Sequence, residues 1–388
     1  MLDLLERYAI PAERAVLSLA TCPGKPFFLE SGYIMKYWQL AELPEDKLQY
    51  TLECAGIIQT DPALRALAWH LYRYLTLTPM AQVQSEKLPD IIDELGIKTG
   101  VLYLLVAMSF IPGFIARAER ENFPRRYGEA AAKRIGSTTC FFAQAYDGAF
   151  GLRGRTLLFM LHYIQTATWR IGRFDFVIQK ADNTIPEIYR KGDKIIAFCA
   201  DGIPLRSDLD RALNDDEAVQ IAGITVNGSC VTGIPIDFAS GLAQSTTATI
   251  DLAQGWERIA GPGDWTLFFH IPGGGKMTPQ LCEDSFAEAI EFFASYAPDK
   301  KFRLLWSASW IFNPAWNTLL PDSNMASLIQ RGRLFPATSA NNPGLYFVFG
   351  RNDGDPDSFT AVNRVEKAVL QCYKNNTLRR VGWFMLVD

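Results

Sequence analysis

The segment from Trp265 to Pro279 has the composition of an anion-binding site. A β-rich stretch is followed by three consecutive glycines and then by a helix start. The glycines are Gly273, Gly274 and Gly275. Glycines let the backbone approach a phosphate closely, and the amide groups at a helix start face the bound charge. Lys276 adds a positive side chain and Thr278 suits the cap position. The segment predicts a phosphate site, with a plain tight turn before a helix as the structural alternative.

Three groups of side chains are candidates for proton transfer near this segment. His270 precedes the glycines; an imidazole with a reference pKa of about 6.5 suits a general base, and a structural or anion-contacting role is the alternative. A polar run after Leu319 consists of Asp322, Ser323 and Asn324. It could face a reaction site or form an ordinary turn and helix cap. Cys282 shares an apolar spacing with Phe286, which favours a packed thiol over a reactive one.

Aromatic and polar residues on and directly after the next β-rich stretch, Phe302–Ser309, are candidates for substrate contact. They are Trp306, Ser309 and Trp310. Tryptophans at such positions line a pocket or pack in the core, and the sequence leaves both open. His70 and His162 lie in apolar helical segments without acidic partners at metal-ligand spacing. We therefore predict core or boundary histidines and no metal site.

The elements that must position these residues differ between the two halves of the chain. Up to about Trp169, apolar residues recur at helical spacing, and prolines separate the segments. The apolar run Val101–Ala116 is shorter than the roughly 20 residues of a spanning helix, and Pro112 interrupts it. This run predicts a buried core helix.

The second half predicts short strands and then alternating strands and helices. The β-rich runs are Phe174–Ile178, Ile185–Tyr189, Ile195–Cys199, Ile221–Val226 and Ile234–Phe238, with a single helix over Ser207–Val219. Pro186 and Pro235 restrict their runs to edge strands, if these runs are strands at all, and Asn227-Gly228 predicts a hairpin. The later elements are strands over Trp265–Ile271, Phe302–Ser309, Leu345–Gly350 and Gly382–Val387, and helices over Pro279–Ala297, Pro314–Ile329 and Ala361–Lys374. We predict two domains, 1–170 all helical and 171–388 α/β, hence α+β overall.

Composition narrows the class of protein. The formal net charge is −4, from 38 basic and 42 acidic residues spread along the chain, so no broad cationic surface is available for nucleic acid. Seven cysteines without a CxxC pair form neither a disulfide framework nor a zinc pattern. The amino-terminal residues lack the pattern of an export signal. We expect a cytoplasmic protein that binds neither nucleic acid nor membrane.

Several motifs together resemble a known family. They are HIPGGGKM, the helix CEDSFAEAIEFF, Ser309-Trp310, Asn313-Pro314, LLPDSN, Phe347-Val-Phe-Gly350 and the terminal Gly382-Trp-Phe-Met-Leu386. This set is similar to the carboxyl-terminal GNAT-like domain of a bacterial acyltransferase family whose members carry a helical amino-terminal domain. The resemblance spans most of the chain and is strongest from Trp265 to Asn324. It implies an all-helical domain followed by a mixed sheet with helices packed on it.

The resemblance also implies a site. In the superfamily the pyrophosphate turn is Gln or Arg, two residues, Gly, one residue, and Gly or Ala; here His270 takes the first place. The implied contacts to CoA are Ile271, Gly273, Gly274, Gly275, Lys276 and Met277. The pantetheine arm would lie where the strand at Trp265–Ile271 splays from the strand at Phe302–Ser309. The implied reaction transfers an acyl group, most often acetyl, from CoA to an amine acceptor without a metal.

Two other functions fit the same residues. One is a non-catalytic GNAT-like module that binds CoA or another ligand and has lost turnover. The other takes the β-rich middle as a carbohydrate- or peptide-binding sandwich on a helical scaffold. CoA affinity distinguishes the last from the first two, and thioester turnover distinguishes the enzyme from the binding module.

Overall fold

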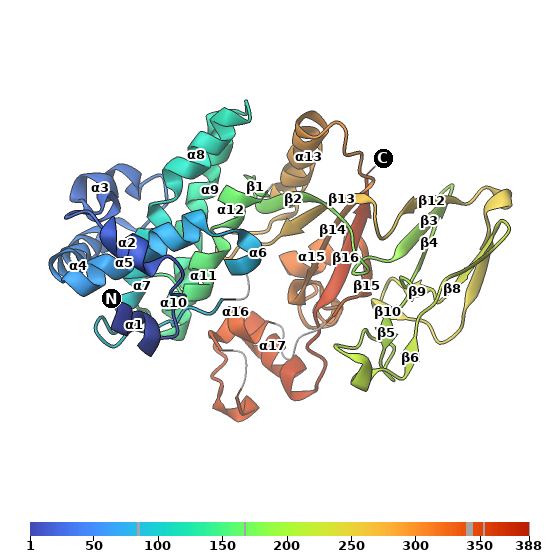
Figure 1. The fold of residues 1–388 in the computed structure, drawn as a ribbon. Helices are drawn as coiled ribbons and strands as arrows, with labels where there is room; N and C mark the ends of the chain where they lie inside the picture. The colour runs from blue at the N-terminus through green and yellow to red at the C-terminus, as the bar shows by residue number, and fades with distance from the viewer. Residues whose placement is uncertain (84–85, 167, 339–343, 352–353, 388) are drawn as a thin grey trace. The chain divides into compact units, whose positions relative to one another are not determined.

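The computed structural model describes residues 1–83, 86–166, 168–338, 344–351 and 354–387 (Figure 1). The chain forms two compact units. The first comprises Met1–Ile171 and Ile271–Gly275, and the second comprises Gly172–His270 and Lys276–Asp388. The division after Ile171 lies beside the boundary predicted at residue 170. The glycine segment differs from the prediction, because its contacts assign it to the first unit although both its flanks belong to the second.

The first unit is helical apart from one strand. Its elements are α1 (Leu2–Arg7), α2 (Ala15–Ala20), α3 (Ser31–Trp38), α4 (Leu48–Thr60), α5 (Pro62–Leu77), α6 (Met80–Val83), α7 (Thr99–Met108), α8 (Ile111–Arg120), α9 (Arg125–Ser137), α10 (Thr139–Ala145), α11 (Gly154–Phe159), α12 (His162–Gln165) and β1 (Thr168–Ile171). Local signals set these bounds, as α5 shows. The Asp61 carboxylate accepts hydrogen bonds from the amides of Ala63 and Leu64, and Pro62 occupies the first helical position.

The apolar run over Val101–Ala116 forms the centre of this unit. Every residue of α7 is buried, and α8 starts after a short break with Pro112 in its first turn. By length and hydropathy alone, Thr99–Arg120 could cross a membrane, but 83% of its most apolar window is buried inside the protein. The predicted buried core helix is confirmed, as two consecutive helices rather than one.

His70 makes the stability of this unit dependent on pH. Its ring is fully buried on α5, with Nδ1 3.1 Å from the Ser18 hydroxyl and Nε2 2.7 Å from the Pro11 carbonyl. Burial lowers the pKa of His70, so the native state excludes a proton that the unfolded chain binds below about pH 6.5. The contribution of His70 to stability is therefore fully present above about pH 6.5 and is lost as the pH falls below that value.

We expect the native protein to lose up to about 1.4 kcal/mol per pH unit in that range through this one group. The measurement is urea denaturation of the wild type and His70→Gln between pH 5 and 8. The wild type should show a steeper loss than the variant, which has no titrating ring at this position. Parallel curves would contradict a role for His70.

The second unit is built on a large sheet (Figure 1). Five of its strands, in spatial order, are β2 (Phe174–Lys180), β13 (Trp265–His270), β14 (Leu304–Ser309), β16 (Val381–Leu386) and β15 (Arg333–Pro336). The β13–β14 pair is parallel and the other pairs are antiparallel. On one face, Phe269 and Trp383 pack against Phe286 of α13 (Pro279–Tyr296) with ring centroids 5.2 and 5.8 Å away. The strands predicted at β2, β13, β14 and β16 and the helix predicted at α13 are confirmed, and β15 was not predicted.

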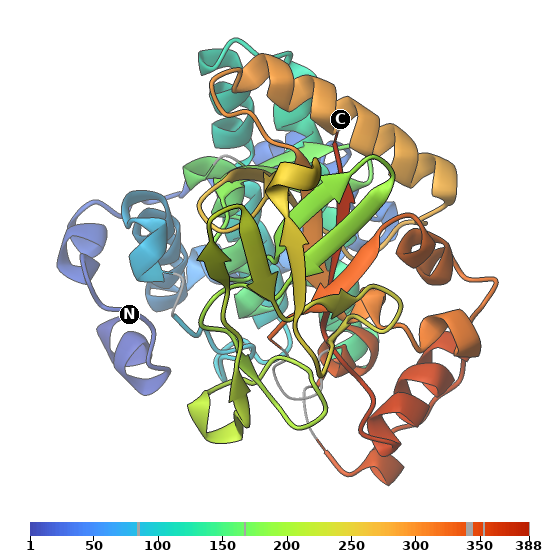
Figure 2. The same cartoon turned by 90° about the vertical axis from the view of Figure 1, so that its right-hand side faces the viewer.

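The β-rich middle of the chain covers the opposite face of this sheet (Figure 2). Its strands are β3 (Glu187–Lys191), β4 (Lys194–Phe198), β5 (Pro204–Leu205), β6 (Gln220–Ile221), β7 (Thr225–Asn227), β8 (Cys230–Gly233), β9 (Ile236–Asp237), β10 (Leu242–Ala243), β11 (Ala248–Asp251) and β12 (Glu257–Ala260). The predicted hairpin joins β7 to β8. The prediction that Pro186 marks an edge strand is wrong, because β3 begins after this proline and lies between β12 and β4.

Three predicted elements differ in the structure. Leu345–Gly350 is not a strand but a short helix, α16 (Leu345–Phe349), between Gly344 and Gly350, which have φ of +109° and +75°. Ser207–Val219 is not a helix: Asp208 and Asn214 accept backbone hydrogen bonds that form turns, and one 3₁₀ turn, Asp215–Glu217, follows. The helix predicted over Pro314–Ile329 is divided into α14 (Trp316–Leu319) and α15 (Asn324–Gln330). The predicted helix near the carboxyl end is α17 (Arg364–Lys374).

Candidate functional site

The parallel pair β13 and β14 separates toward its carboxyl ends. The ladder between the two strands joins only Leu267 to Leu305 and Phe268 to Trp306. Beyond that point each strand continues with its outer partner, β13 with β2 up to His270 and β14 with β16 up to Ser309. The two strands therefore form the splay that the family resemblance implies. Such an opening presents backbone groups of both strands to a ligand.

His270 ends β13 beside this opening and pairs with Asp175 of β2 across the antiparallel ladder. Side chains directly opposite each other on antiparallel strands share a face, with Cβ atoms about 4.5–5.5 Å apart. Asp175 is fully buried, and the Phe268 ring lies 4.7 Å from the His270 ring at 86°. The register therefore places a carboxylate and an imidazole on the same face of the sheet.

Asp175 was missed from the sequence. The local signal was present, since an acid between Phe174 and Phe176 in an apolar strand is unusual. Its relation to His270, however, depends on the register of β2 against β13, which nothing in the sequence specified.

The glycine turn has the geometry of a tight turn with two accessible residues. Gly274 and Gly275 are exposed and have φ of +68° and +72°, a conformation that favours glycine. A Cβ on Gly273 would lie 2.4 Å from the Phe141 ring, and one on Gly274 would lie 3.2 Å from the Ser137 carbonyl oxygen. Close packing against Phe141 explains why residue 273 is a glycine. The positive φ explains the glycines at 274 and 275. The phosphate site remains a prediction that this accessible turn allows.

Basic residues gather at the start of α13. Thr278 caps the helix as predicted, its hydroxyl 3.4 Å from the third helical amide. Arg173 donates from Nε to the carbonyl of Lys276 at 3.1 Å, and Arg331 pairs with Glu283 at 2.7 Å. The second pair neutralises an acid that would otherwise repel a phosphate near the helix start. Both arginines are distant in sequence and were not anticipated.

Cys282, in the first turn of α13, is a packed thiol as predicted. Its side chain is 1% exposed. Burial raises the pKa of the Cys282 thiol, although Arg173 and Arg331 act in the opposite direction. The group is therefore neutral at pH 7 and is not a nucleophile. In the described ranges no three His, Cys, Asp or Glu residues are grouped as metal ligands.

The polar run before α15 serves as a helix cap. The Ser323 hydroxyl accepts a hydrogen bond from the Ala326 amide at 3.1 Å. Asp322 and Asn324 are exposed on either side of it. The structure thus supports the capping interpretation for Ser323, and a catalytic role for the three residues stays a prediction.

The predicted substrate contacts on and directly after β14 lie in different surroundings. Trp306 is 4% exposed, donates to the Thr266 hydroxyl at 3.0 Å and packs 4.6 Å from Phe268. Ser309 caps a short 3₁₀ turn, Trp310–Phe312, that follows the strand. Trp310 is partly exposed, and its carbonyl accepts from the Trp316 indole at 2.9 Å. Of these residues, Ser309 and Trp310 lie at the splayed end of β14, and Trp306 belongs to the core.

The splayed parallel pair, followed by a tight turn and a long helix, defines a GNAT-type domain. The chain belongs to the family described as "GNAT-like C-terminal domain", whose model matches residues 168–384. This match covers nearly all of the second unit, and the helical first half precedes it as the family resemblance implies.

Solved acyltransferase structures have a similar fold over almost the whole chain. One, an acyltransferase in complex with decanoyl-CoA and teicoplanin, is 17% identical with a TM-score of 0.62, covering 100% of this chain and 99% of that chain. Another, an acyltransferase in complex with decanoyl-CoA, is 15% identical with a TM-score of 0.58, covering 98% and 97%. The likeness includes the helical half. No curated protein matches the sequence.

Proposed function

We propose that this protein transfers an acyl group from acyl-CoA to an amine acceptor. The observation that carries the proposal is the splay of β13 from β14 directly before a glycine turn and the start of α13. Family membership and the acyl-CoA ligands of the similar structures support it. The thioester acyl group is acetyl, the expectation from the resemblance, or a medium chain such as those held by the similar proteins.

The residues of the splay suit direct transfer. The amine nitrogen attacks the thioester carbonyl carbon, and backbone N–H groups at the opening stabilise the oxyanion that develops. His270 accepts a proton from the attacking nitrogen, and the carbon–sulfur bond then breaks. The leaving CoA thiolate takes up a proton, so the products are an amide and free CoA. Asp175 stabilises the charged imidazole during this sequence.

The first test is thermal unfolding with acetyl-CoA, octanoyl-CoA, decanoyl-CoA and free CoA. A ligand at 100 times its dissociation constant adds about 2.7 kcal/mol to the native state. We expect the thioesters to raise Tm, and the chain length that raises it most identifies the acyl group. The same thioesters are then incubated with amine acceptors, teicoplanin among them, and thiol release is measured. Binding without thiol release would favour the non-catalytic module.

A matched pair of variants at Gly274 locates the pyrophosphate. Gly274→Ala and Gly274→Asp add the same Cβ at φ +68°, so both carry the same backbone strain. Only the aspartate adds a charge that repels a phosphate. We expect the acyl-CoA stabilisation to persist in the alanine variant and to disappear in the aspartate variant. Equal stabilisation of both variants would place CoA elsewhere.

A further inference from the structure

Phe268 lies at the closed end of the opening between β13 and β14. The last pair of the parallel ladder joins Phe268 to Trp306. Neighbouring paired strands lie only about 4.8 Å apart, so a ligand cannot pass between the strands at this pair. Beyond it the strands separate toward His270 and Ser309. A ligand that enters from the wide end of the opening therefore reaches Phe268 last.

The Phe268 ring stands on the same face of the sheet as His270. Alternate side chains of a strand point to the same face, and the two rings lie 4.7 Å apart at 86°. The Phe268 side chain is only partly buried, so part of its ring is accessible to a ligand. An amine that gives its proton to His270 attacks from this face. The acyl group under attack is therefore on the side where the Phe268 ring stands.

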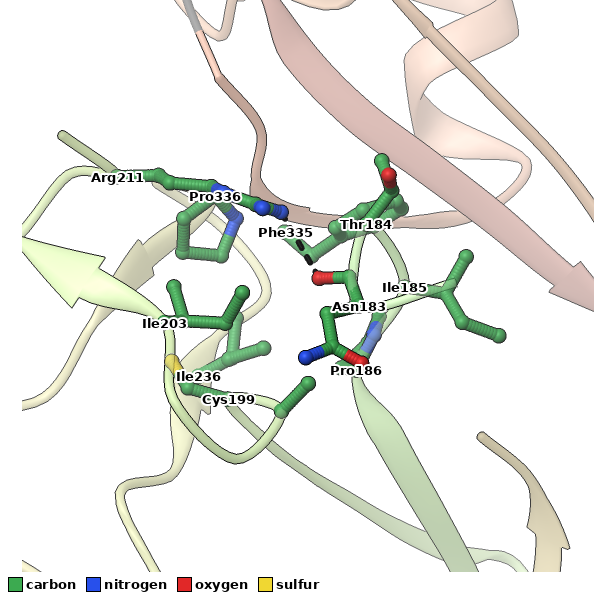
Figure 3. A pocket seen from close by; sticks show the side chains of 11 residues that line it. Asn183, Thr184, Ile185, Pro186, Cys199, Ile203, Arg211, Ile236, Phe335 and Pro336 are labelled. Atoms are coloured by element: carbon green, nitrogen blue, oxygen red, sulfur yellow. Dashed lines mark hydrogen bonds between the residues drawn. The ribbon is translucent and has the colours of Figure 1, made fainter. Parts of the chain in front are cut away.

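Trp306 supports the Phe268 ring from behind. The two rings lie 4.6 Å apart at 61°, and Trp306 is 4% exposed. Its indole N–H donates to the Thr266 hydroxyl at 3.0 Å, and the Phe335 ring lies 6.3 Å away between centroids. Phe335 belongs in turn to the core that includes Ile203 of the β-rich middle (Figure 3). Phe268 thus has a packed and hydrogen-bonded wall behind it.

The opposite face of the sheet offers no alternative space beside the opening. Phe269, Phe312 and Trp383 are fully buried there. The rings of Phe312 and Trp383 stack 5.7 Å apart at 15°, and Phe269 meets Trp383 edge-on at 5.7 Å. Protein cores of this kind are close-packed. An acyl chain that turned to this face would have to displace core aromatic rings.

The chain between Phe268 and the glycine turn limits the space for an acyl group. Gly273 follows Phe268 by five residues, which span at most about 17 Å when fully extended. The pantetheine arm of CoA has about as many chain atoms as four residues, roughly 13 Å when extended. With the pyrophosphate at the glycine turn, an extended arm leaves at most about 4 Å between the thioester sulfur and Phe268.

We propose that Phe268, supported by Trp306, limits the acyl group of the CoA thioester to a short chain of about two to four carbon atoms. The proposal rests on the acyl transfer proposed above and names its acyl substrate. A longer chain would have to displace the Phe268 ring, and inserting methylene groups into a packed site is unfavourable. Two similar acyltransferases were solved with decanoyl-CoA, so this selectivity distinguishes the chain from them.

Calorimetric titration of the full-length protein with free CoA, acetyl-CoA, butanoyl-CoA and octanoyl-CoA tests the proposal without an acceptor. The wild type should bind acetyl-CoA and butanoyl-CoA at least about tenfold more tightly than octanoyl-CoA, because the longer chain overpacks the site. Phe268→Ala should raise the ratio of octanoyl-CoA to acetyl-CoA affinity about 10- to 100-fold, since methylene groups then occupy the space of the ring. Phe268→Leu, a smaller truncation, should give a ratio between the two.

Phe238→Ala is the matched control. Phe238 is also a partly buried phenylalanine of the second unit. Its ring lies 5.7 Å from that of Phe384 in β16, so it packs on β16 rather than at the end of the ladder between β13 and β14. The ratio of octanoyl-CoA to acetyl-CoA affinity should not change in this variant.

Two results would overturn the proposal and leave acyl transfer standing. One is octanoyl-CoA binding as tight as acetyl-CoA binding in the wild type, and the other is an unchanged ratio in folded Phe268→Ala. Absence of binding of free CoA and of every thioester would overturn the proposed acyl transfer as well. The wild-type comparison needs no variant and decides the question even where Phe268→Ala fails to fold.

Discussion

Replacing His270 by glutamine is expected to lower thiol release from acyl-CoA by about 10²- to 10⁴-fold, the usual contribution of a positioned general base. The affinity for acyl-CoA should change little, because the glutamine side chain keeps a polar group at the end of β13. The measurement is kcat with a saturating amine, together with the acyl-CoA dissociation constant from the thermal shift. This combination separates the two roles that the sequence left open for His270. Loss of affinity with unchanged kcat would assign His270 to anion binding instead.

Asp175→Asn tests the pairing across the ladder between β2 and β13. Removing the carboxylate destabilises the charged imidazole of the wild-type pair. The variant should therefore have a lower kcat and an unchanged dissociation constant for acyl-CoA, a combination that a merely structural role would not produce. His162→Gln, a histidine substitution in α12 of the first unit, serves as the control and should keep both quantities. An unchanged kcat in Asp175→Asn would contradict a coupling between the two side chains.

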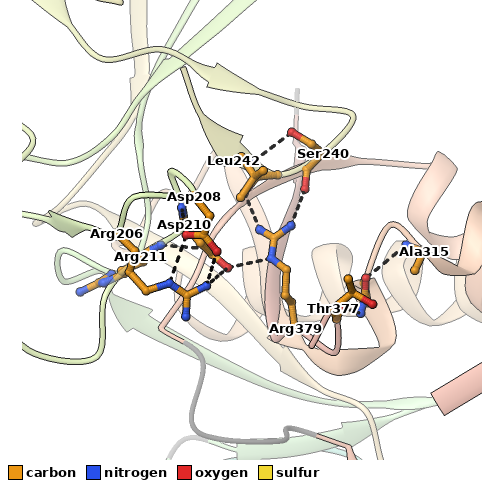
Figure 4. Close-up of polar contacts among 11 residues, drawn as sticks. Arg206, Asp208, Asp210, Arg211, Ser240, Leu242, Ala315, Thr377 and Arg379 are labelled. Atoms are coloured by element: carbon orange, nitrogen blue, oxygen red, sulfur yellow. Dashed lines mark hydrogen bonds and ion pairs between the residues drawn. The ribbon is translucent and has the colours of Figure 1, made fainter. Parts of the chain in front are cut away.

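Asp210→Asn is expected to destabilise the second unit by about 3–5 kcal/mol, because removing one partner leaves the other charge buried and uncompensated. Asp210 is fully buried, and its Oδ2 lies 2.7 Å from Nε of Arg379 (Figure 4). Arg379, whose side chain is 16% exposed, also donates to the carbonyls of Ser240 and Gly241. The pair thus ties the segment before β16 to the β-rich middle. Urea denaturation followed by tryptophan fluorescence measures the loss.

Asp208→Asn is the matched control for this pair. Asp208 bonds Arg206 at 2.6 Å but is 55% exposed, and exposed pairs contribute less than about 1 kcal/mol. The two substitutions are chemically identical and two residues apart. A loss of similar size in both variants would show that burial of the Asp210 carboxylate does not increase the contribution of its ion pair to stability.

Elements with strong local signals were predictable from the sequence. α13 is an example, because the cap at Thr278, the proline at the first helical position and the apolar spacing to Phe286 all lie within one segment. The buried helices of the first unit follow from their hydropathy in the same way. Short apolar runs were not predictable: Leu345–Gly350 has strand-forming residues, yet it is helical between two glycines with positive φ. A run of this length is too short for the spacing of its apolar residues to distinguish a strand from a helix.

β15 was missed for a related reason. It is a short edge strand of the large sheet that ends in Pro336, and a proline in such a run argues against a strand unless it lies at an edge. Only its pairing with β16 establishes that this segment is a strand.

The sequence by itself determined the succession of helical and α/β halves, the glycine turn with its capped helix and the family to which the chain belongs. The tertiary structure alone decided that β13 parts from β14 and that Asp175 lies opposite His270 in the ladder between β2 and β13. The physical reason is the range of the interactions. Caps, turns and amphipathic periods act between residues at most a few positions apart. Strand register depends on closing loops of many residues, which burial of the whole sheet stabilises and no local segment encodes.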